Sequence, residues 1–203
     1  MIITIGREFG SGGRELGKRL AEALGIAYYD KEIVSEVAKK TDLAYEYVQN
    51  IIEKRPIVYY PISIGHSFED YTSYIAGQHS SVQAEQERVI KELAEKADCV
   101  IVGRCADYIL RDLNPYKIFV YANMDVKVKR CVDKGEVDTS LNDRKIRKTI
   151  KLIDKQRAEY YEFFTGSKWG DKANYDLMIN TSNQSIKEIA LGLAEIIKQN
   201  DKR

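Results

Sequence analysis

Residues 6–15 read GREFGSGGRE, and this segment decides the fold. It follows a short apolar run at residues 2–5 without a break, and it leads into a segment with leucines at helical spacing. Glycines let a loop turn successive N–H groups toward one point, and the N-terminus of a following helix adds a partial positive charge there. A strand, a glycine-rich loop and a helix in this order predict a cradle for a polyphosphate.

Four further apolar runs follow the first, and each is too short to be a helix. They are residues 27–29, 99–102, 118–121 and 177–179. Segments with helical periodicity separate them, which is the pattern of parallel strands joined by crossover helices. The sequence therefore predicts an α/β fold, a three-layer sandwich built on a five-stranded parallel sheet.

Three helices are marked by their end signals. The first spans residues 14–24, the second begins at Ser80 with Gln83 as its capping-box partner, and the last begins at Ser185. Residues 56–77 show weak periodicity and predict an inserted loop or a small helical flap.

Size and charge limit the function. The chain has 203 residues, 44% of them hydrophobic, which suits a single domain. The formal net charge is +1, so no overall field marks a binder of nucleic acid polymers or membrane surfaces. The positive charge is concentrated in residues 127–157, where 11 basic residues face 5 acidic ones. Any anion site is therefore expected to be local.

Cysteine and histidine usage indicates the compartment. Three cysteines without a C-x-x-C pair predict neither a disulfide framework nor a zinc site, and the two histidines are far apart. No apolar run reaches the roughly 18 residues of a membrane span. We expect a cytoplasmic protein without a protein-bound metal, and the sequence leaves its oligomeric state open.

The glycine loop departs from the common phosphate-loop motif, G-x-x-x-x-G-K-[ST]. Aligned from the helix, Gly12 takes the last-glycine position and Gly13 takes the position of the lysine. The lysine is missing, so we expect Arg14 to supply the charge and Ser11 or Glu15 to help hold Mg²⁺. The predicted nucleotide-binding residues are Gly10, Ser11, Gly12, Gly13, Arg14 and Glu15.

Two other interpretations of the loop are open. One is a glycine-rich turn with only a structural role. The other is a dinucleotide-binding loop, because Gly10 and Gly12 are followed, about 20 residues on, by Asp30 after the next strand. The third glycine of that motif falls on Glu15, whose carboxylate would lie beside a pyrophosphate. This substitution disfavours a nicotinamide or flavin cofactor.

One arginine outside the loop follows a predicted strand. Arg104 comes just after residues 99–102, and ligands of open parallel sheets bind outside the carboxyl ends of the strands. We expect Arg104 to contact a phosphate as a bidentate donor. A surface ion pair with Asp107 is the alternative.

A second arginine continues an apolar helix face. Arg157 lies at helical spacing from Ile150 and Ile153, so it points inward and needs a partner or a cleft. Asp154 is placed to orient it, and Arg147 flanks the same face. We expect Arg157 and Arg147 to face the site, whereas a solvated basic surface is the alternative.

Together these segments resemble the cytidylate kinase-like branch of the nucleoside monophosphate kinases. The matching motifs, in chain order, are residues 5–15, 28–32, 102–104, 154–157 and 180–182. The resemblance implies a phosphate-loop (P-loop) kinase fold with a monophosphate-binding flap at about 31–97 and a lid at about 135–157. Cytidylate kinases have an aspartate directly after the arginine that matches Arg104, whereas this chain has Cys105, so the base specificity is open.

The resemblance also implies roles. It suggests transfer of the γ-phosphoryl group of ATP, with Mg²⁺, to a small acceptor, foremost a nucleoside monophosphate such as CMP. The expected catalytic residues are Arg14, Arg104 and Arg157, and the expected substrate-binding residues are Asp30, Arg104 and Arg147. The alternative is a non-catalytic nucleotide or anion sensor that kept the cradle and lost the lysine.

Overall fold

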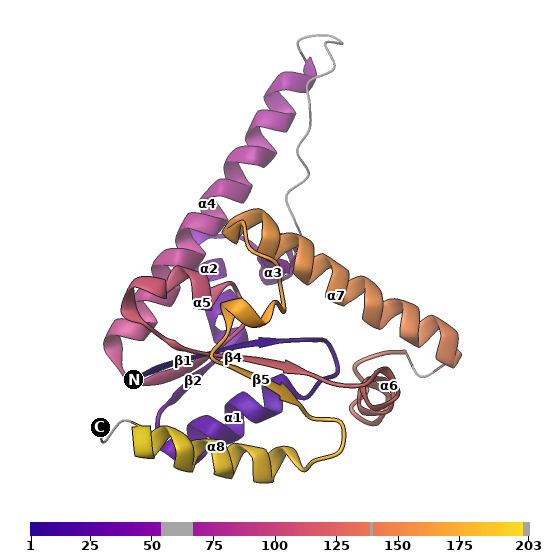
Figure 1. Cartoon of the computed structure of the whole chain (residues 1–203). Helices are drawn as coiled ribbons and strands as arrows, with labels where there is room; N and C mark the ends of the chain where they lie inside the picture. The colour runs from indigo at the N-terminus through magenta and orange to yellow at the C-terminus, as the bar shows by residue number, and fades with distance from the viewer. Residues whose placement is uncertain (54–66, 139, 201–203) are drawn as a thin grey trace.

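The computed structural model describes residues 1–53, 67–138 and 140–200, and within them the chain forms one sheet of five parallel strands (Figure 1). The strands are β1 (Ile2–Arg7), β2 (Ala27–Tyr29), β3 (Cys99–Val102), β4 (Tyr116–Tyr121) and β5 (Leu177–Asn180). Their order across the sheet is β2-β3-β1-β4-β5, and every neighbouring pair is parallel. Each predicted strand is present, which confirms the five-stranded sheet.

Helices cover both faces of this sheet, as Figure 1 shows. On one face lie α1 (Gly13–Leu24) and α8 (Ile186–Asn200), and on the other lie α2 (Lys31–Thr41), α3 (Tyr45–Glu53), α4 (Ser67–Lys96) and α5 (Ala106–Ile109). The alternation of β3 builds both cores, because Val100 and Val102 pack toward α1 while Cys99 and Ile101 pack toward α4. The predicted three-layer α/β sandwich is confirmed.

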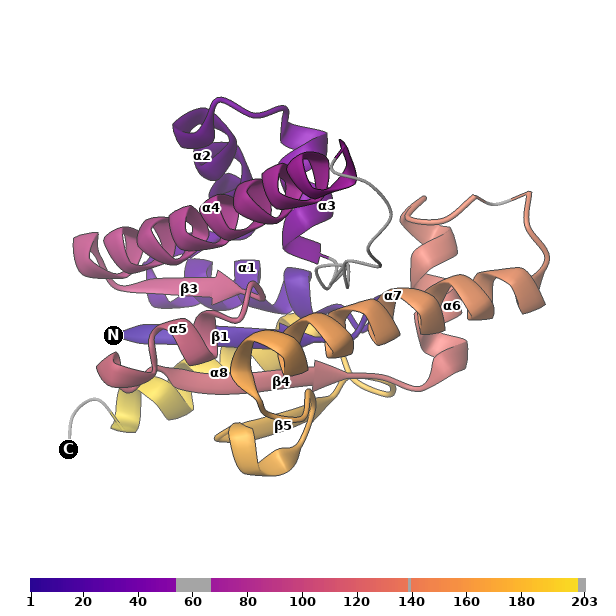
Figure 2. The ribbon, with the colours of Figure 1, turned by 90° about the horizontal axis from the view of Figure 1, so that it is seen from above.

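Two more helices follow β4. They are α6 (Met124–Asp133) and α7 (Asp143–Thr165), and Figure 2 places α6 beyond the carboxyl ends of the strands. Cys131, Ile146 and Ile150 pack these two helices together against Phe9 of the glycine loop. Short 3₁₀ turns, Arg111–Leu113 and Lys172–Asn174, precede β4 and β5.

The prediction that the second helix begins at Ser80 is wrong. α4 begins at Ser67, so residues 67–77 continue the helix, whereas residues 54–66 of the expected insert lie outside the described part of the chain. Ser80 and Gln83 match a capping box by sequence, but the same spacing occurs inside helices. A single interior glycine, Gly77, costs a helix only about 1 kcal/mol and does not end it.

The strand order fixes where a ligand can bind. The chain leaves β1 through α1 toward β2 on one side, and β4 lies on the other side of β1. Crossovers that diverge in this way leave a crevice outside the carboxyl ends of the central strands. Arg7 ends β1 and Gly103 follows β3, and the Gly103 amide donates to the Ile5 carbonyl oxygen at 2.9 Å. The crevice is therefore bounded by the glycine loop and by the residues after β3.

Among the described residues, none of the helices combines the length and apolar character that crossing a membrane requires.

Candidate active site

The glycine loop is shaped by backbone conformations and close contacts that favour glycine. Gly10 and Gly12 have φ of 72° and 85°, and Gly12 is the N-cap of α1. A Cβ added at Gly10 would lie 2.9 Å from the Lys127 carbonyl oxygen of α6. The positive φ and the close approach of α6 together explain the glycines of this segment.

Ser11 holds the loop from within. Its side chain is fully buried, and its hydroxyl donates to the Glu8 carbonyl oxygen at 2.8 Å and accepts from the Gly13 amide at 3.4 Å. Its carbonyl oxygen accepts from Arg130 at 2.8 Å and from the Thr181 hydroxyl at 2.6 Å. Ser11 is thus part of the loop's support.

Backbone amides are the donors that the glycine loop has available. Within the described residues, the N–H groups of Gly10, Gly12, Arg14 and Glu15 have no hydrogen-bond acceptor. They belong to the segment that leads into the N-terminal end of α1, where the helix dipole favours an anion. The predicted cradle therefore has donors available for phosphate oxygens.

A cavity of about 520 Å³ lies beside this loop. Its walls include five of the six predicted loop residues, all except Ser11. Other elements bring further charged side chains to it: Asp30 after β2, Arg130 and Lys134 from α6, and Arg157 from α7. Residues that are far apart in the sequence therefore bring charged side chains to one cavity.

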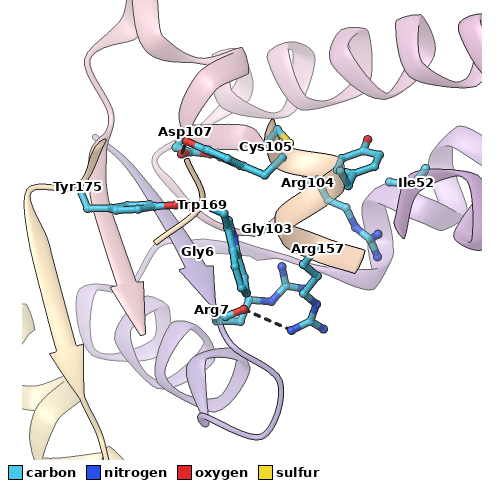
Figure 3. A pocket seen from close by; sticks show the side chains of 12 residues that line it. Gly6, Arg7, Ile52, Gly103, Arg104, Cys105, Asp107, Arg157, Trp169 and Tyr175 are labelled. Carbon is cyan, nitrogen blue, oxygen red and sulfur yellow. Dashed lines mark hydrogen bonds between the residues drawn. The ribbon is translucent and has the colours of Figure 1, made fainter. Parts of the chain in front are cut away.

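A second, smaller cavity of about 50 Å³ lies on the far side of Arg7 and Arg157 (Figure 3). Arg104, Cys105 and Asp107 line it from the segment after β3. Four aromatic residues also line it, namely Tyr160, Tyr161, Trp169 and Tyr175. Arg7 and Arg157 line both cavities, so the two spaces adjoin at these guanidinium groups.

The charges around this junction are mostly positive. Arg14, Arg104 and Arg157 each act electrostatically on Arg7, and the buried carboxylate of Asp30 opposes them. Asp30 lies 2.6 Å from the Arg14 Nε and 3.8 Å from an Arg7 nitrogen. Burial, and next the charge of Arg157, lower the pKa of Arg7 to about 9. An anionic ligand would relieve this repulsion.

Arg157 is placed by the strand end and the loop. Its Nη1 donates to the Arg7 carbonyl oxygen at 3.3 Å, and its guanidinium lies 5.6 Å from the centre of the Phe9 ring. Asp154 accepts from the Phe9 amide at 2.7 Å and from Lys127 at 2.5 Å, and Lys127 also contacts Glu8 at 3.1 Å. The loop, α6 and α7 are thereby joined by a partly buried ion-pair network.

The smaller cavity contains an unusual carboxyl group. Asp107 accepts from the Tyr161 hydroxyl at 2.7 Å, and burial raises the pKa of its carboxyl. Burial also raises the pKa of the neighbouring Cys105 thiol, which therefore stays neutral. Beside them the Tyr160 hydroxyl donates to Gln83 at 2.9 Å. The wall thus combines aromatic rings with polar groups that can select a ligand.

Two predicted residues, Ser11 and Arg147, line neither cavity, and Arg104 lines only the smaller one. Arg147 is paired with Asp125 at 2.5 Å and with Asp143 at 2.6 Å, and it lines neither cavity. The Ser11 side chain is buried inside the loop, and its hydroxyl bonds to the loop's own backbone. Glu15 lines the cavity, but its carboxylate is held by Arg19 at 2.9 Å and Lys134 at 2.8 Å.

Arg7 is the site residue that the sequence interpretation missed. A signal was present: β1 ends in Ile5-Gly6-Arg7 and its neighbour β3 runs into Val102-Gly103-Arg104. Because parallel strands end at the same edge, the repeated motif brings Arg7 and Arg104 to one crevice. Trp169 and Tyr175 had no local signal, since only the packing of the chain after α7 brings them to the cavity.

The sheet order, the glycine loop at the end of β1 and the arginines around it define a P-loop kinase fold. The fold is shared with a shikimate kinase from Bacteroides thetaiotaomicron, with a TM-score of 0.57, 15% identity and 98% of each chain covered. A solved structure of an uncharacterised protein from Eubacterium ventriosum is 32% identical, with a TM-score of 0.69 over 100% of this chain and 99% of that one.

The family follows from the sequence profile. Residues 2–183 match the cytidylate kinase-like family, and the chain belongs to this family. A cytidylate kinase from Methanopyrus kandleri is 25% identical over 198 residues, which cover 93% of this chain and 88% of that protein. These relationships support a kinase that uses a nucleotide.

Proposed function

We propose that this protein transfers the γ-phosphoryl group of ATP to a small acceptor, and that the acceptor is a nucleoside monophosphate such as CMP. The observation that carries the proposal is the adjoining pair of cavities. One lies beside the unpaired amides of the loop, the other beside Arg104 and aromatic rings, and Arg7 and Arg157 line both. Two phosphate-bearing ligands would meet at these arginines.

The two cavities would bind different ligands. The amides of Gly10, Gly12, Arg14 and Glu15 would hold the β- and γ-phosphates of ATP, because these residues line the larger cavity and their N–H groups have no acceptor among the described residues. Arg104 would hold the acceptor phosphate, and the rings of the smaller cavity would pack against its base. Asp30 would act as a positioning residue, because its buried carboxylate contacts Arg14 and lies near Arg7.

The acceptor requires movement of the flap and lid. The smaller cavity measures about 50 Å³, against the roughly 300 Å³ or more of usual ligand pockets. We assign the flap to residues 31–97 and the lid to residues 135–157. Their opening would admit the acceptor, and their closure would exclude water from the transfer.

The transfer itself needs little covalent help. An ionised phosphate oxygen of the acceptor forms a bond to the γ-phosphorus, the bond from that phosphorus to the β–γ bridging oxygen breaks, and ADP leaves with the electron pair. No proton has to be removed from such a nucleophile. The arginines at the junction offset the charge that develops on the transferred group.

The divalent cation would be held by the nucleotide. Ser11 and Glu15, the two side chains expected to help, are engaged by the loop backbone and by Arg19 and Lys134. Mg²⁺ bound to the phosphates of ATP would supply charge neutralisation. The residues of the loop would then bind the phosphates through their amides.

A turnover assay tests the proposal. The protein is incubated with ATP, Mg²⁺ and one of CMP, UMP, dCMP, AMP or a non-nucleotide acceptor, and the products are identified by ³¹P NMR. We expect a nucleoside diphosphate from at least one monophosphate. Arg104→Met should raise the KM of that acceptor about tenfold or more, since it removes a charge-assisted contact. Arg111→Met, in the exposed turn that follows α5, is the matched control and should leave that KM unchanged.

The missing lysine favours a second candidate, a nucleotide sensor without turnover. Both functions predict that ATP stabilises the protein against heat. ATP binding at micromolar concentration without product from any acceptor would establish the sensor and reject the kinase.

A further inference from the structure

We propose that Arg7 takes the part of the missing loop lysine, so that its guanidinium contacts the phosphoryl group in transfer. This inference rests on the proposed function and assigns a residue of that same site. Gly13 occupies the lysine position and has no side chain, and the charge was expected from Arg14 instead. The structure gives Arg7 the better placement.

Position is the first argument. Arg7 ends β1 at the centre of the sheet, and it lines both cavities. Figure 3 shows its side chain at the smaller one, beside Arg157. Arg14 lines the larger cavity but not the smaller one. A group that passes from a donor in one cavity to an acceptor in the other has to cross the space beside Arg7.

The fit around Arg7 is the second argument. A Cβ at Gly103 would lie 1.6 Å from the Arg7 Nη1, and a Cβ at Gly13 would lie 2.5 Å from the Arg7 Cβ. Both glycines therefore leave room for this one side chain. The positive φ of Gly103, 75°, also favours glycine there, but the two close approaches leave the Arg7 side chain little room to take another orientation.

Charge is the third argument. The Arg14 side chain is 50% exposed and its Nε lies 2.6 Å from Asp30, so much of its charge is already neutralised. The Arg7 side chain is 12% exposed, and its nearest carboxylate oxygen is 3.8 Å away. Arg157, Arg104 and Arg14 repel it. A buried cation that is short of a counter-ion gains most from a phosphoryl group.

The first test separates ATP from ADP in direct binding. Calorimetry measures both nucleotides, with Mg²⁺, on the wild type and on Arg7→Met. We expect the Kd of ATP to rise about tenfold while the Kd of ADP changes less than about twofold, because only ATP carries the contacted group. An equal rise in the Kd of ATP and of ADP, or no rise in either, would overturn the role of Arg7. Arg88→Met, an exposed arginine on α4, is the control.

The second test uses turnover. Arg7→Met should lower kcat about 100-fold, as the loss of a transition-state donor does, and Arg7→Lys should recover part of it. A kcat within threefold of wild type in Arg7→Met would reject the assignment. A wild type without turnover rejects the kinase proposal, and the ATP-against-ADP comparison then still decides whether Arg7 contacts the terminal phosphate. A wild type that binds neither nucleotide rejects both.

The third test moves Arg7 without changing its charge. Gly103→Ala introduces a Cβ into the space of the guanidinium, so it should produce the same selective loss of ATP affinity. The positive φ of 75° also strains the backbone of this variant, but that strain lowers stability and does not distinguish ATP from ADP. This variant and Arg7→Lys also decide the question if Arg7→Met does not fold. Unchanged preference for ATP over ADP in both would overturn the proposal.

Discussion

The two cavities are built in opposite ways. The larger one rests on a continuous segment, residues 8–15, which contributes backbone amides held in place by positive φ. The smaller one is assembled from side chains that follow β3, belong to α7 or precede β5. The donor side is therefore set by the backbone and the acceptor side by packing, so substitutions should affect them differently.

The largest effect is expected from Gly10→Ala on the backbone-built side. The new Cβ meets the Cys131 sulfur at 2.7 Å and the Lys127 carbonyl oxygen at 2.9 Å, and φ is 72°. We expect the free energy of unfolding to fall by about 2 kcal/mol or more and ATP affinity to fall at least about tenfold. Urea unfolding and calorimetry measure the two effects.

Gly25→Ala is the matched control for that variant. Gly25 also has a positive φ, 71°, but no atom lies within 4 Å of an added Cβ. Only the conformational strain of about 1 kcal/mol remains, and ATP affinity should not change. Similar losses of ATP affinity in both variants would mean that the contact with α6 does not shape the cradle.

A smaller effect is expected from Arg14→Ala. The guanidinium is half-exposed and already paired with Asp30, so it contributes less to phosphate binding than an unpaired charge. We expect ATP affinity to fall about fivefold, or roughly 1 kcal/mol. A loss larger than that of Arg7→Met would contradict the division of roles between these two arginines.

In the smaller cavity, Asp107→Asn tests whether the pKa of the Asp107 carboxyl is raised. A carboxyl with a raised folded pKa holds its proton more tightly in the folded protein, so stability is lost as the pH rises through that pKa. The asparagine stays neutral and its oxygen can still accept from Tyr161. Relative to wild type, the variant should therefore gain stability as the pH rises from about 4, the ordinary pKa of an aspartate, through the raised pKa of the folded carboxyl.

Urea unfolding of both proteins across that range measures the gain. A stability difference that is the same at every pH would show that Asp107 is not buried enough to be perturbed. As an internal control, Asp107→Asn should bind ATP with the same affinity as the wild type, since the carboxyl lines only the smaller cavity.

The smallest effect is expected from Arg147→Ala. Arg147 was predicted to bind substrate, yet its guanidinium is paired with Asp125 and Asp143 and lies outside both cavities. Turnover and both KM values should stay within about twofold of wild type. A clear rise in the KM of the acceptor would show that the lid carries Arg147 into the site when it closes.

Local patterns were enough to predict much of the fold. Short apolar runs between helical segments predicted all five strands, and the glycines of residues 6–15 predicted an amide-lined loop that is present. The start of α4 was misplaced because a capping signature does not exclude a helix that continues through it. These successes and this error have one cause: neighbouring residues set strand, loop and helix preferences.

By itself, the sequence determined the parallel sheet, the glycine cradle and the inward face that carries Arg157, because each depends on residues a few positions apart. The tertiary structure alone decided that Arg7 lines both cavities, that Asp30 neutralises Arg14 and that Arg147 is paired elsewhere. Those outcomes depend on which strand ends and helices meet in space. Charge interactions act over such distances regardless of separation along the chain, so composition and spacing do not reveal them.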